Sequence, residues 1–180
     1  NEWQRLEWKF RIPKGFQPTT KFCHLHQLKA QEGNNGAPLI TISTRCDKDG
    51  GNKRVQVIHT GDTRTSGKGV IIDNLPLADF EDEWIQVETE MHYTHHGTFR
   101  IKLTRISDGK VLADQSFADV DLWRKGATSI RNKFGIYRSL GRKMQSASDR
   151  PDNGLKDESL QLADFKVYEA HTNPNPQPHD

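Results

Sequence analysis

The sequence has few of the features that would place it in a membrane-spanning, disulfide-rich or helical class. Only two of its 180 residues are cysteines, and hydrophobic residues make up 33% of the chain. No run of about 18 apolar residues occurs, which excludes a membrane-spanning helix. No convincing long helix is indicated either, and only residues 118–125 suggest a single helical turn. Val, Ile, Thr, Phe and Trp recur in short alternating runs, which favours an antiparallel β architecture.

The two cysteines, Cys23 and Cys46, each lie in a predicted strand. They would form a disulfide if those strands are neighbours, as is usual in secreted proteins, or they are two buried thiols. We favour the disulfide and expect a secreted, extracellular protein. The chain opens in mid-strand at Asn1-Glu2-Trp3 without a signal peptide, which suggests that the native start has been cut away.

Alternating apolar and polar residues predict about nine strands. In the first, even-numbered residues from 6 to 12 are apolar and odd-numbered residues from 5 to 11 are charged, so one face is buried and the other open. Asp108-Gly109 lies between two such runs and predicts a hairpin turn. The predicted strands are residues 3–12, 22–30, 38–45, 54–60, 84–94, 98–107, 111–117, 131–139 and 159–169.

This number of short strands predicts one all-β domain over residues 1–170. We expect a two-sheet antiparallel sandwich, in the form of a concanavalin-like β-jelly roll. Residues 171–180 are rich in proline. Because alternate prolines remove the backbone donors of a strand, this segment is expected to be a tail or linker.

Positive charge is concentrated late in the chain, although the formal net charge is only +2. Eight Lys or Arg and a single acid, Asp149, lie between Arg124 and Arg150, which gives a local charge of 8 − 1 = +7. Such a zone attracts a polyanion. Nucleic acid would fit this charge too, and an ordinary solvated surface is the simplest alternative.

Three predicted strands place reactive side chains on an open face. Residues 133–137, Lys133-Phe134-Gly135-Ile136-Tyr137, offer a cation, a gap and a phenol on one face, with Phe134 and Ile136 on the other. Residues 5–9, Arg5-Leu6-Glu7-Trp8-Lys9, and residues 24–27, His24-Leu25-His26-Gln27, show polar faces of the same kind. Together they suggest a groove that grips an anionic sugar.

These segments resemble, in the same order, the signature strands of jelly-roll polysaccharide lyases of the alginate-lyase kind: R-x-E-x-R/K, Q-x-H and a late K-x-G-x-Y. Residues 22–29 and 134–139 look closer still to the glucuronan lyases, polysaccharide lyase family 20. The resemblance implies β-elimination, in which the C5 proton of a uronic acid is removed and the oxygen at C4 is expelled. That chemistry needs a neutralised substrate carboxylate, a base and an acid.

The resemblance also implies roles for individual residues. Tyr137 matches the acid and can serve as the base as well, whereas His26 matches a histidine that acts as base or polarises the site. Arg5 matches the arginine that contacts the carboxylate, to which its planar fork is suited. Lys133 would favour the tyrosinate form of Tyr137 or bind a neighbouring carboxylate. Each of these residues could instead be structural. Further expected substrate-binding residues are His24, Gln27, Lys29, Glu7, Lys9 and Arg138.

The sequence departs from the alginate lyases at His24, where those enzymes have glutamine. Glutamine donates a hydrogen bond at any pH, while the donors of histidine depend on its tautomer and charge. The residue that neutralises the carboxylate is therefore open. Gln27 could replace it, although a regular strand would place Gln27 and His26 on opposite faces. A β-bulge would reconcile the two.

The preferred substrate is β-1,4-glucuronan, because its C5 proton and C4 oxygen lie on the same side of the ring. One phenol can then act as the base at C5 and as the acid at the C4 oxygen. Alginate, ulvan and glycosaminoglycans stay open. The main alternative is a non-catalytic carbohydrate-binding module of the same fold. A retaining glycosidase would need a pattern of paired acids that this sequence lacks. A nucleic-acid binder would need more exposed aromatic residues than the sequence offers. We expect an anionic polysaccharide as partner, no nucleic acid or membrane, and a monomer.

Other histidines and acids offer weaker signals. His92, His95 and His96 form a cluster that we interpret as a loop rim, and His59 is interpreted as a core residue. The glucuronan lyase resemblance suggests a structural Ca²⁺, for which Asp164 is a weak candidate ligand. The turn Asp47-Lys48-Asp49-Gly50 is interpreted as a simple turn. No organic cofactor is expected.

Overall fold

Ten β-strands and one short 3₁₀ helix form the part of the chain that the computed structural model describes, residues 2–140 and 155–172. The elements, in chain order, are β1 (Trp3–Arg11), β2 (Cys23–Ala30), β3 (Ile40–Arg45), β4 (Arg54–His59), β5 (Gly69–Pro76), η1 (Leu77–Asp79), β6 (Ile85–His92), β7 (Gly97–Arg105), β8 (Val111–Val120), β9 (Ile130–Arg138) and β10 (Gln161–Ala170). No helix among these residues is long and apolar enough to cross a membrane.

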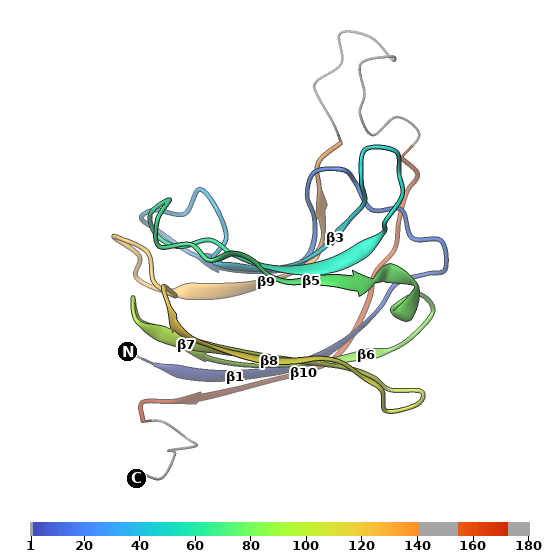
Figure 1. The fold of residues 1–180 in the computed structure, drawn as a ribbon. Coiled ribbons are helices and arrows are strands. Elements are labelled where there is room, and N and C mark those ends of the chain that lie inside the picture. Colours follow the sequence, from blue (N-terminus) through green and yellow to red (C-terminus); the bar gives the residue numbers. More distant parts are fainter. Residues whose placement is uncertain (1, 141–154, 173–180) are drawn as a thin grey trace, which may run out of the picture.

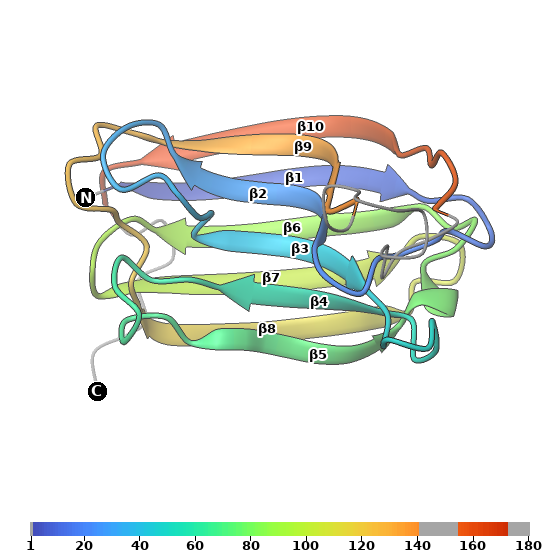
Figure 2. The ribbon, with the colours of Figure 1, turned by 90° about the horizontal axis from the view of Figure 1, so that it is seen from above.

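The strands form two five-stranded antiparallel sheets that lie face to face (Figure 1). The first sheet has the order β10-β1-β6-β7-β8, and the second has the order β5-β4-β3-β2-β9. Seen from above in Figure 2, the strands of the two layers run in nearly the same direction. The predicted fold class, an all-β antiparallel sandwich of the jelly-roll type, is confirmed.

The core lies between the sheets because each strand turns its apolar residues toward the opposite sheet. In β1, Leu6, Trp8 and Phe10 are fully buried, and β6 and β7 alternate between buried and half-buried residues over most of their lengths. Full burial of one such side chain contributes roughly 1.5–3 kcal/mol. The polar residues of these strands consequently face away from the other sheet.

Nine of the ten strands lie where the sequence predicts them, and the Asp108-Gly109 turn joins β7 to β8 with Gly109 at φ +70°. Strand β5, in which only Ile72 is buried, was not predicted from the sequence. This strand contains Asn74, at φ +62°, and Pro76, and both are poor strand formers. Residues 118–125 do not form the predicted helical turn, because β8 continues to Val120.

A β-bulge interrupts β2. His24 lies opposite Ser43 of β3, while His26 lies opposite Ile42, the very next residue on that strand. One residue of β2, Leu25, is therefore extra in this step. Because side chains alternate strictly along a regular strand, one extra residue exchanges the faces of everything that follows it. His24 and His26 thus point to opposite sides of the second sheet.

The register between β2 and β9 shifts at the same place. His24 lies opposite Tyr137, but His26 lies opposite Phe134, so β9 contributes two intervening residues where β2 contributes one. One of the two is Gly135, at φ +120°. Residues with a side chain adopt this conformation only with strain. Glycine at this position therefore accommodates the register shift, while Tyr137 and Phe134, three residues apart, lie on opposite faces by ordinary strand alternation.

Two further predictions concern buried groups. Cys23 and Cys46 are both buried thiols, so the favoured disulfide is wrong and the alternative of two buried thiols is confirmed. Arg124, predicted as part of the basic zone, is only 2% exposed. Its guanidinium donates to the carbonyls of residues 37, 38, 60 and 61. It thus ties loops together and adds no charge to the surface.

Candidate active site

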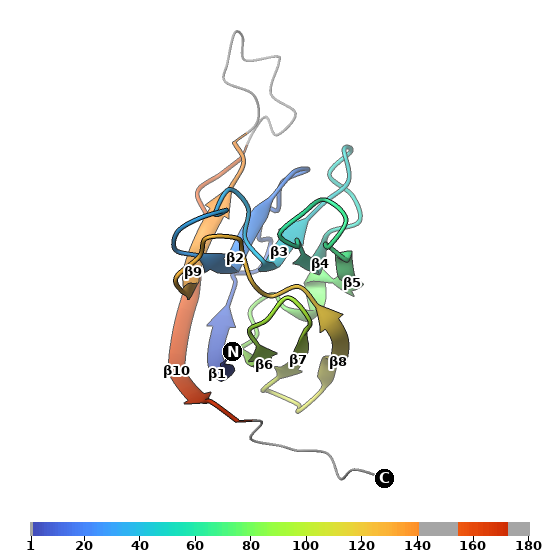
Figure 3. The ribbon, with the colours of Figure 1, turned by 90° about the vertical axis from the view of Figure 1, so that its left-hand side faces the viewer.

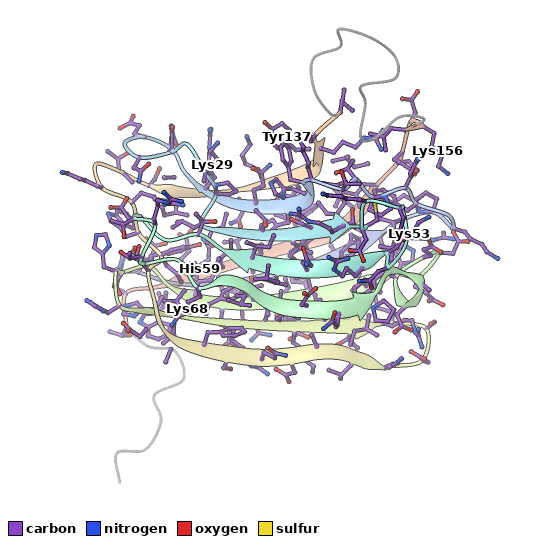
Figure 4. The ribbon with its side chains drawn as sticks, turned by 45° about the horizontal axis from the view of Figure 1, so that its top comes forward. Lys29, Lys53, His59, Lys68, Tyr137 and Lys156 are labelled. Carbon is purple, nitrogen blue, oxygen red and sulfur yellow. The ribbon has the colours of Figure 1, made fainter. Side chains whose placement is uncertain are left out.

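The second sheet turns one face away from the core, and we call this outer face the open face. Cross-strand pairing identifies its members, because residues directly opposite each other share a face. Tyr137 lies opposite His24, Gln27 opposite Lys133, and Lys29 opposite Arg131. On β3 and β4, the same face is formed by Thr41, Ser43, Arg45, Arg54 and Gln56. Figure 4 labels Lys29 and Tyr137 on this face, from β2 and β9.

A phenol and an imidazole lie side by side on the open face. The ring centroids of His24 and Tyr137 are 6.1 Å apart, and Phe22 packs against both rings at 5.1 and 5.2 Å. Each such aromatic contact contributes about 0.5–1.5 kcal/mol beyond its buried area. Tyr137 is nevertheless 57% exposed. The phenol is therefore held in place and still accessible to a ligand.

The hydrogen bonds of His24 define its tautomer. The Ser43 hydroxyl donates to Thr41 Oγ1 at 3.0 Å and lies 2.7 Å from His24 Nδ1. A hydroxyl has one proton to donate, so Ser43 accepts from Nδ1–H of His24. The other ring nitrogen, Nε2, then carries the lone pair. Thr41 and Ser43 thus prepare His24 as a proton acceptor.

The charge state of His24 supports the same role. Burial, and then the positive charge of Arg45, lower the pKa of His24 from 6.5 to about 4. At neutral pH the ring is therefore uncharged and Nε2 is free to take a proton. A general base must combine this protonation state with access to substrate. His24 is half-buried, so part of its ring faces solvent.

Arg45 is the cation that the sequence analysis missed. It lies two residues beyond Ser43 on the open-face side of β3, and its side chain has no ion pair or hydrogen bond with any described residue. Its neighbour across the strands, Arg54, is paired with Asp47 and Asp73. Arg45 is thus positioned to bind an incoming carboxylate beside His24. The signal was available: Thr41, Ser43 and Arg45 alternate with Ile40 and Ile42 along a strand that was predicted.

The structure does not bring His26 to the open face, which corrects its predicted role as base. His26 is only 3% exposed, and its ring lies 5.3 Å from the core residue Trp8 and 5.0 Å from Phe134, which is half-buried against the core. Its Nε2 lies 2.9 Å from Asn132 Oδ1. The bulge after His24 is the physical reason for this inward orientation. Burial lowers the pKa of His26 to about 4.

The hydrogen bonds of His26 continue across the interior. Asn132 donates to Gln4 at 3.1 Å, and the Tyr93 hydroxyl donates to the same oxygen of Gln4 at 2.9 Å. This polar chain ends at a pocket of about 250 Å³, next to Trp123 and Glu169. No residue of the open face lines that pocket. His26 therefore belongs to a polar tie between the two sheets.

Arg5, Glu7 and Lys9 lie on the wrong sheet for their predicted roles. β1 belongs to the first sheet (Figure 3), and its polar residues face away from the second sheet. There, Glu7 pairs with Arg5 and with Lys166, and Lys9 pairs with Asp164 at 2.5 Å. The predicted convergence of Arg5, His26 and Tyr137 on one sugar ring is therefore wrong.

The basic zone divides in the structure. Arg131 and Lys133 lie on the open face. Arg138 lies opposite Cys23, a core residue, and its guanidinium donates to the Lys156 carbonyl; it is half-buried away from the open face, which corrects its predicted contact with substrate. Residues 142, 143, 149 and 150 fall outside the described residues.

The remaining histidines have defined partners. His59 is buried, as predicted, and contacts the Asp121 carbonyl and the Lys68 amide. His95 pairs with the Asp121 carboxylate, and His96 pairs with Asp119. These two lie in the turn between β6 and β7 of the first sheet. They therefore lie outside the open face.

Calcium has no fitting site among the described residues. Asp164, the candidate ligand, is occupied by Lys9, and an ammonium group competes with a cation for the same oxygen. Residues 2–140 and 155–172 contain no group of three or more His, Cys, Asp or Glu side chains placed to hold a metal ion. Ca²⁺ prefers six to eight oxygen ligands, so the residues around Asp164 do not fit it.

Comparisons with known proteins identify the architecture. No protein-family model and no curated protein matches the sequence. Solved structures match across most of the chain: endo-β-1,4-glucuronan lyase from the fungus Trichoderma reesei has a TM-score of 0.58 at 15% identity and covers 92% of this chain. The marine alginate lyase from Aplysia kurodai has a TM-score of 0.54 at 13% identity and also covers 92%. An alginate lyase from Pseudomonas aeruginosa has a TM-score of 0.51 at 16% identity and covers 93%.

The chain spans 67%, 69% and 65% of these three structures, respectively. At such low identity, structural similarity establishes the fold and leaves the chemistry to the site. The protein accordingly has the jelly-roll fold of these polysaccharide lyases.

Proposed function

We propose that the protein is a polysaccharide lyase that cleaves a uronic-acid-containing polysaccharide by β-elimination. The observation that carries this proposal is the pair His24 and Tyr137 on one open face. The pair combines a neutral imidazole with a free Nε2 and an accessible phenol, which are a base and an acid. The lyase fold of the neighbouring structures supports the same reaction class.

The reaction assigns one task to each group. His24 Nε2 takes the C5 proton, the electrons of that C–H bond form the C4–C5 double bond, and the bond from C4 to its oxygen breaks. Tyr137 gives its phenolic proton to the departing oxygen. Arg45 binds the substrate carboxylate and stabilises the negative charge that spreads into it as the C5 proton leaves. Arg45 replaces Arg5, and His24 replaces His26, relative to the sequence-based assignment.

The geometry favours β-1,4-glucuronan as the substrate. In a glucuronate ring the C5 proton and the C4 oxygen lie on the same side, so base and acid must approach from one side. His24 and Tyr137 extend from the same face of the sheet, as such a substrate requires. A polysaccharide substrate is met outside the cell, so the proposal also implies a secreted protein.

The test is incubation with β-1,4-polyglucuronate, followed by ultraviolet absorbance of the new double bond. We expect absorbance to rise with the wild type and the initial rate to fall about a hundredfold to ten-thousandfold in Tyr137→Phe, the range for one general acid. Binding of the polymer without any rise in absorbance would instead identify a carbohydrate-binding module. Alginate tested in parallel reports on the choice of uronate.

A further inference from the structure

Three cations at one end of the open face have no counter-charge. The side chains of Lys29, Arg131 and Lys133 make no ion pair and no hydrogen bond with any residue in the ranges 2–140 and 155–172. On the outer face of the first sheet, by contrast, Arg5, Lys9 and Arg100 all pair with acids. Acids accompany these three cations of the first sheet but not the three at this end of the open face; Arg54, elsewhere on the open face, is paired with Asp47 and Asp73.

Repulsion between these neighbouring cations destabilises the folded protein. Lys29 lies directly opposite Arg131 on neighbouring strands, and Lys133 lies one alternation further along β9. Like charges directly opposite each other destabilise a sheet. The pKa of Lys29 is lowered, first by burial and then by Lys133 and Arg131. An anion that binds here would relieve this repulsion, so the cluster is suited to a negatively charged ligand.

The cluster lies too far from the candidate catalytic pair to bind the same sugar ring. Lys29 is five residues from His24 along β2, which corresponds to roughly 16 Å at the rise of a β-strand. That distance exceeds the width of one sugar. Gln27 lies between the two positions on the same face, opposite Lys133, but it is only 5% exposed, which does not support its predicted contact with substrate. A ligand that reaches both ends must be an extended polymer.

We propose that Lys29, Arg131 and Lys133 form a distal subsite that binds a carboxylate of an extended polyuronate, several sugars away from the ring at His24 and Tyr137. This inference rests on the proposed function for the identity of the polymer. The described aromatic residues of the open face, Phe22 and Tyr137, are grouped at the opposite end and do not alternate with the three cations. Non-specific binders of single-stranded nucleic acid combine cations with stacked aromatic residues, so the arrangement favours polyuronate.

The experiment measures binding in the Tyr137→Phe background, in which polymer is cleaved far more slowly than by the wild type. The test variant adds Lys29→Gln and Lys133→Gln, and the control variant adds Lys102→Gln and Lys166→Gln. Both remove two positive charges, but Lys102 and Lys166 lie on the outer face of the first sheet. The probes are β-1,4-polyglucuronate, neutral cello-oligosaccharides and a single-stranded oligonucleotide, each titrated at two salt concentrations.

We expect the dissociation constant for polyglucuronate to rise about tenfold in the test variant, as two solvent-accessible ion pairs would require, and to stay unchanged in the control. Urea unfolding should show the test variant to be at least as stable as its parent, because repulsion is removed. A merely structural role for the two lysines would lower that stability.

Two results would overturn the inference: an equal loss of affinity in both variants, which would indicate net charge alone, or tighter binding of the oligonucleotide than of polyglucuronate at this cluster. The lyase assay is independent of this result. Failure of cleavage with intact distal binding would remove the proposed function and leave the subsite. Cleavage by the wild type, together with an unaltered dissociation constant in the test variant, would remove the subsite and leave the proposed function.

Discussion

His24 and His26 lie two residues apart on the same strand yet face opposite sides of the sheet. His24 contacts Ser43 and Tyr137 on the open face, whereas His26 packs against Trp8 in the core. The bulge at Leu25 separates them. One histidine is therefore available for chemistry and the other contributes to the stability of the sandwich.

This separation predicts opposite phenotypes for two substitutions. His24→Gln should lower the initial rate on polyglucuronate by at least about a hundredfold, because the base is lost, and should change stability little. His26→Ala should lower the free energy of unfolding by about 2–4 kcal/mol, because it removes a buried ring and leaves Asn132 Oδ1 without its donor. Rates and urea unfolding curves check both. The reverse pattern would show that the two histidines have been assigned to the wrong roles.

Ser43→Ala should release the tautomer of His24. Without the Ser43 oxygen, Nδ1–H loses its acceptor and the ring can protonate Nε2 instead. We expect nitrogen chemical shifts of His24 to change from one tautomer to a mixture, and the initial rate to fall. The control is Ser116→Ala on β8, in the other sheet. Unchanged His24 shifts in Ser43→Ala would contradict the tautomer assigned to His24.

Arg45→Gln should weaken substrate binding and also raise the pKa of His24. The pKa of His24 is lowered by burial and by the charge of Arg45, so removing that charge raises it toward 6.5. We expect KM for polyglucuronate to increase about tenfold or more, since a charge-assisted contact is lost. An NMR titration of His24 and steady-state kinetics report the two effects. Arg100→Gln, on the first sheet, serves as the matched control and should alter neither.

The folded protein should lose stability as the pH falls from about 6.5 to about 4. The pKa of His26 is about 4 in the folded state and 6.5 as its ordinary value, so the unfolded chain binds a proton in this range that the folded chain does not. The contribution is fully present above pH 6.5, and the loss is on the order of 3 kcal/mol at the acid end.

Comparison with a variant isolates this effect. His26→Gln cannot titrate, so its unfolding free energy should depend less on pH than that of the wild type over the same range. Urea midpoints at several pH values measure the difference between the two proteins. Parallel pH curves would rule out His26 as the titrating group.

Cys23 and Cys46 should be present as thiols. We expect no reaction with a thiol reagent in the native protein, because both side chains are buried, and reaction of two thiols per chain after denaturation without reductant. Burial raises the pKa of Cys23, which further slows its reaction in the folded state. A protein mass lower by two hydrogen atoms than that of the dithiol, with no reactive thiol on denaturation, would instead indicate a disulfide.

Strand positions and core residues could be predicted from the sequence because alternation is a local property. The burial of Trp8 and His59 could be predicted from their immediate neighbours in the chain, and Tyr137 could be placed on an open face for the same reason. The missed strand β5 has only one buried residue, so its pattern carried little of this information.

The composition of the site depended on non-local pairing. The polar face of β1 looked equal to that of β9, but β1 joins the first sheet, so Arg5 lies far from Tyr137 in the fold. The Leu25 bulge reversed the faces of His24 and His26, and the pairing of β3 with β2 brought Arg45 beside His24. The sequence by itself determined which residues are buried within each strand. Only the tertiary structure decided which open faces coincide, because sheet membership and register are set by contacts between distant segments.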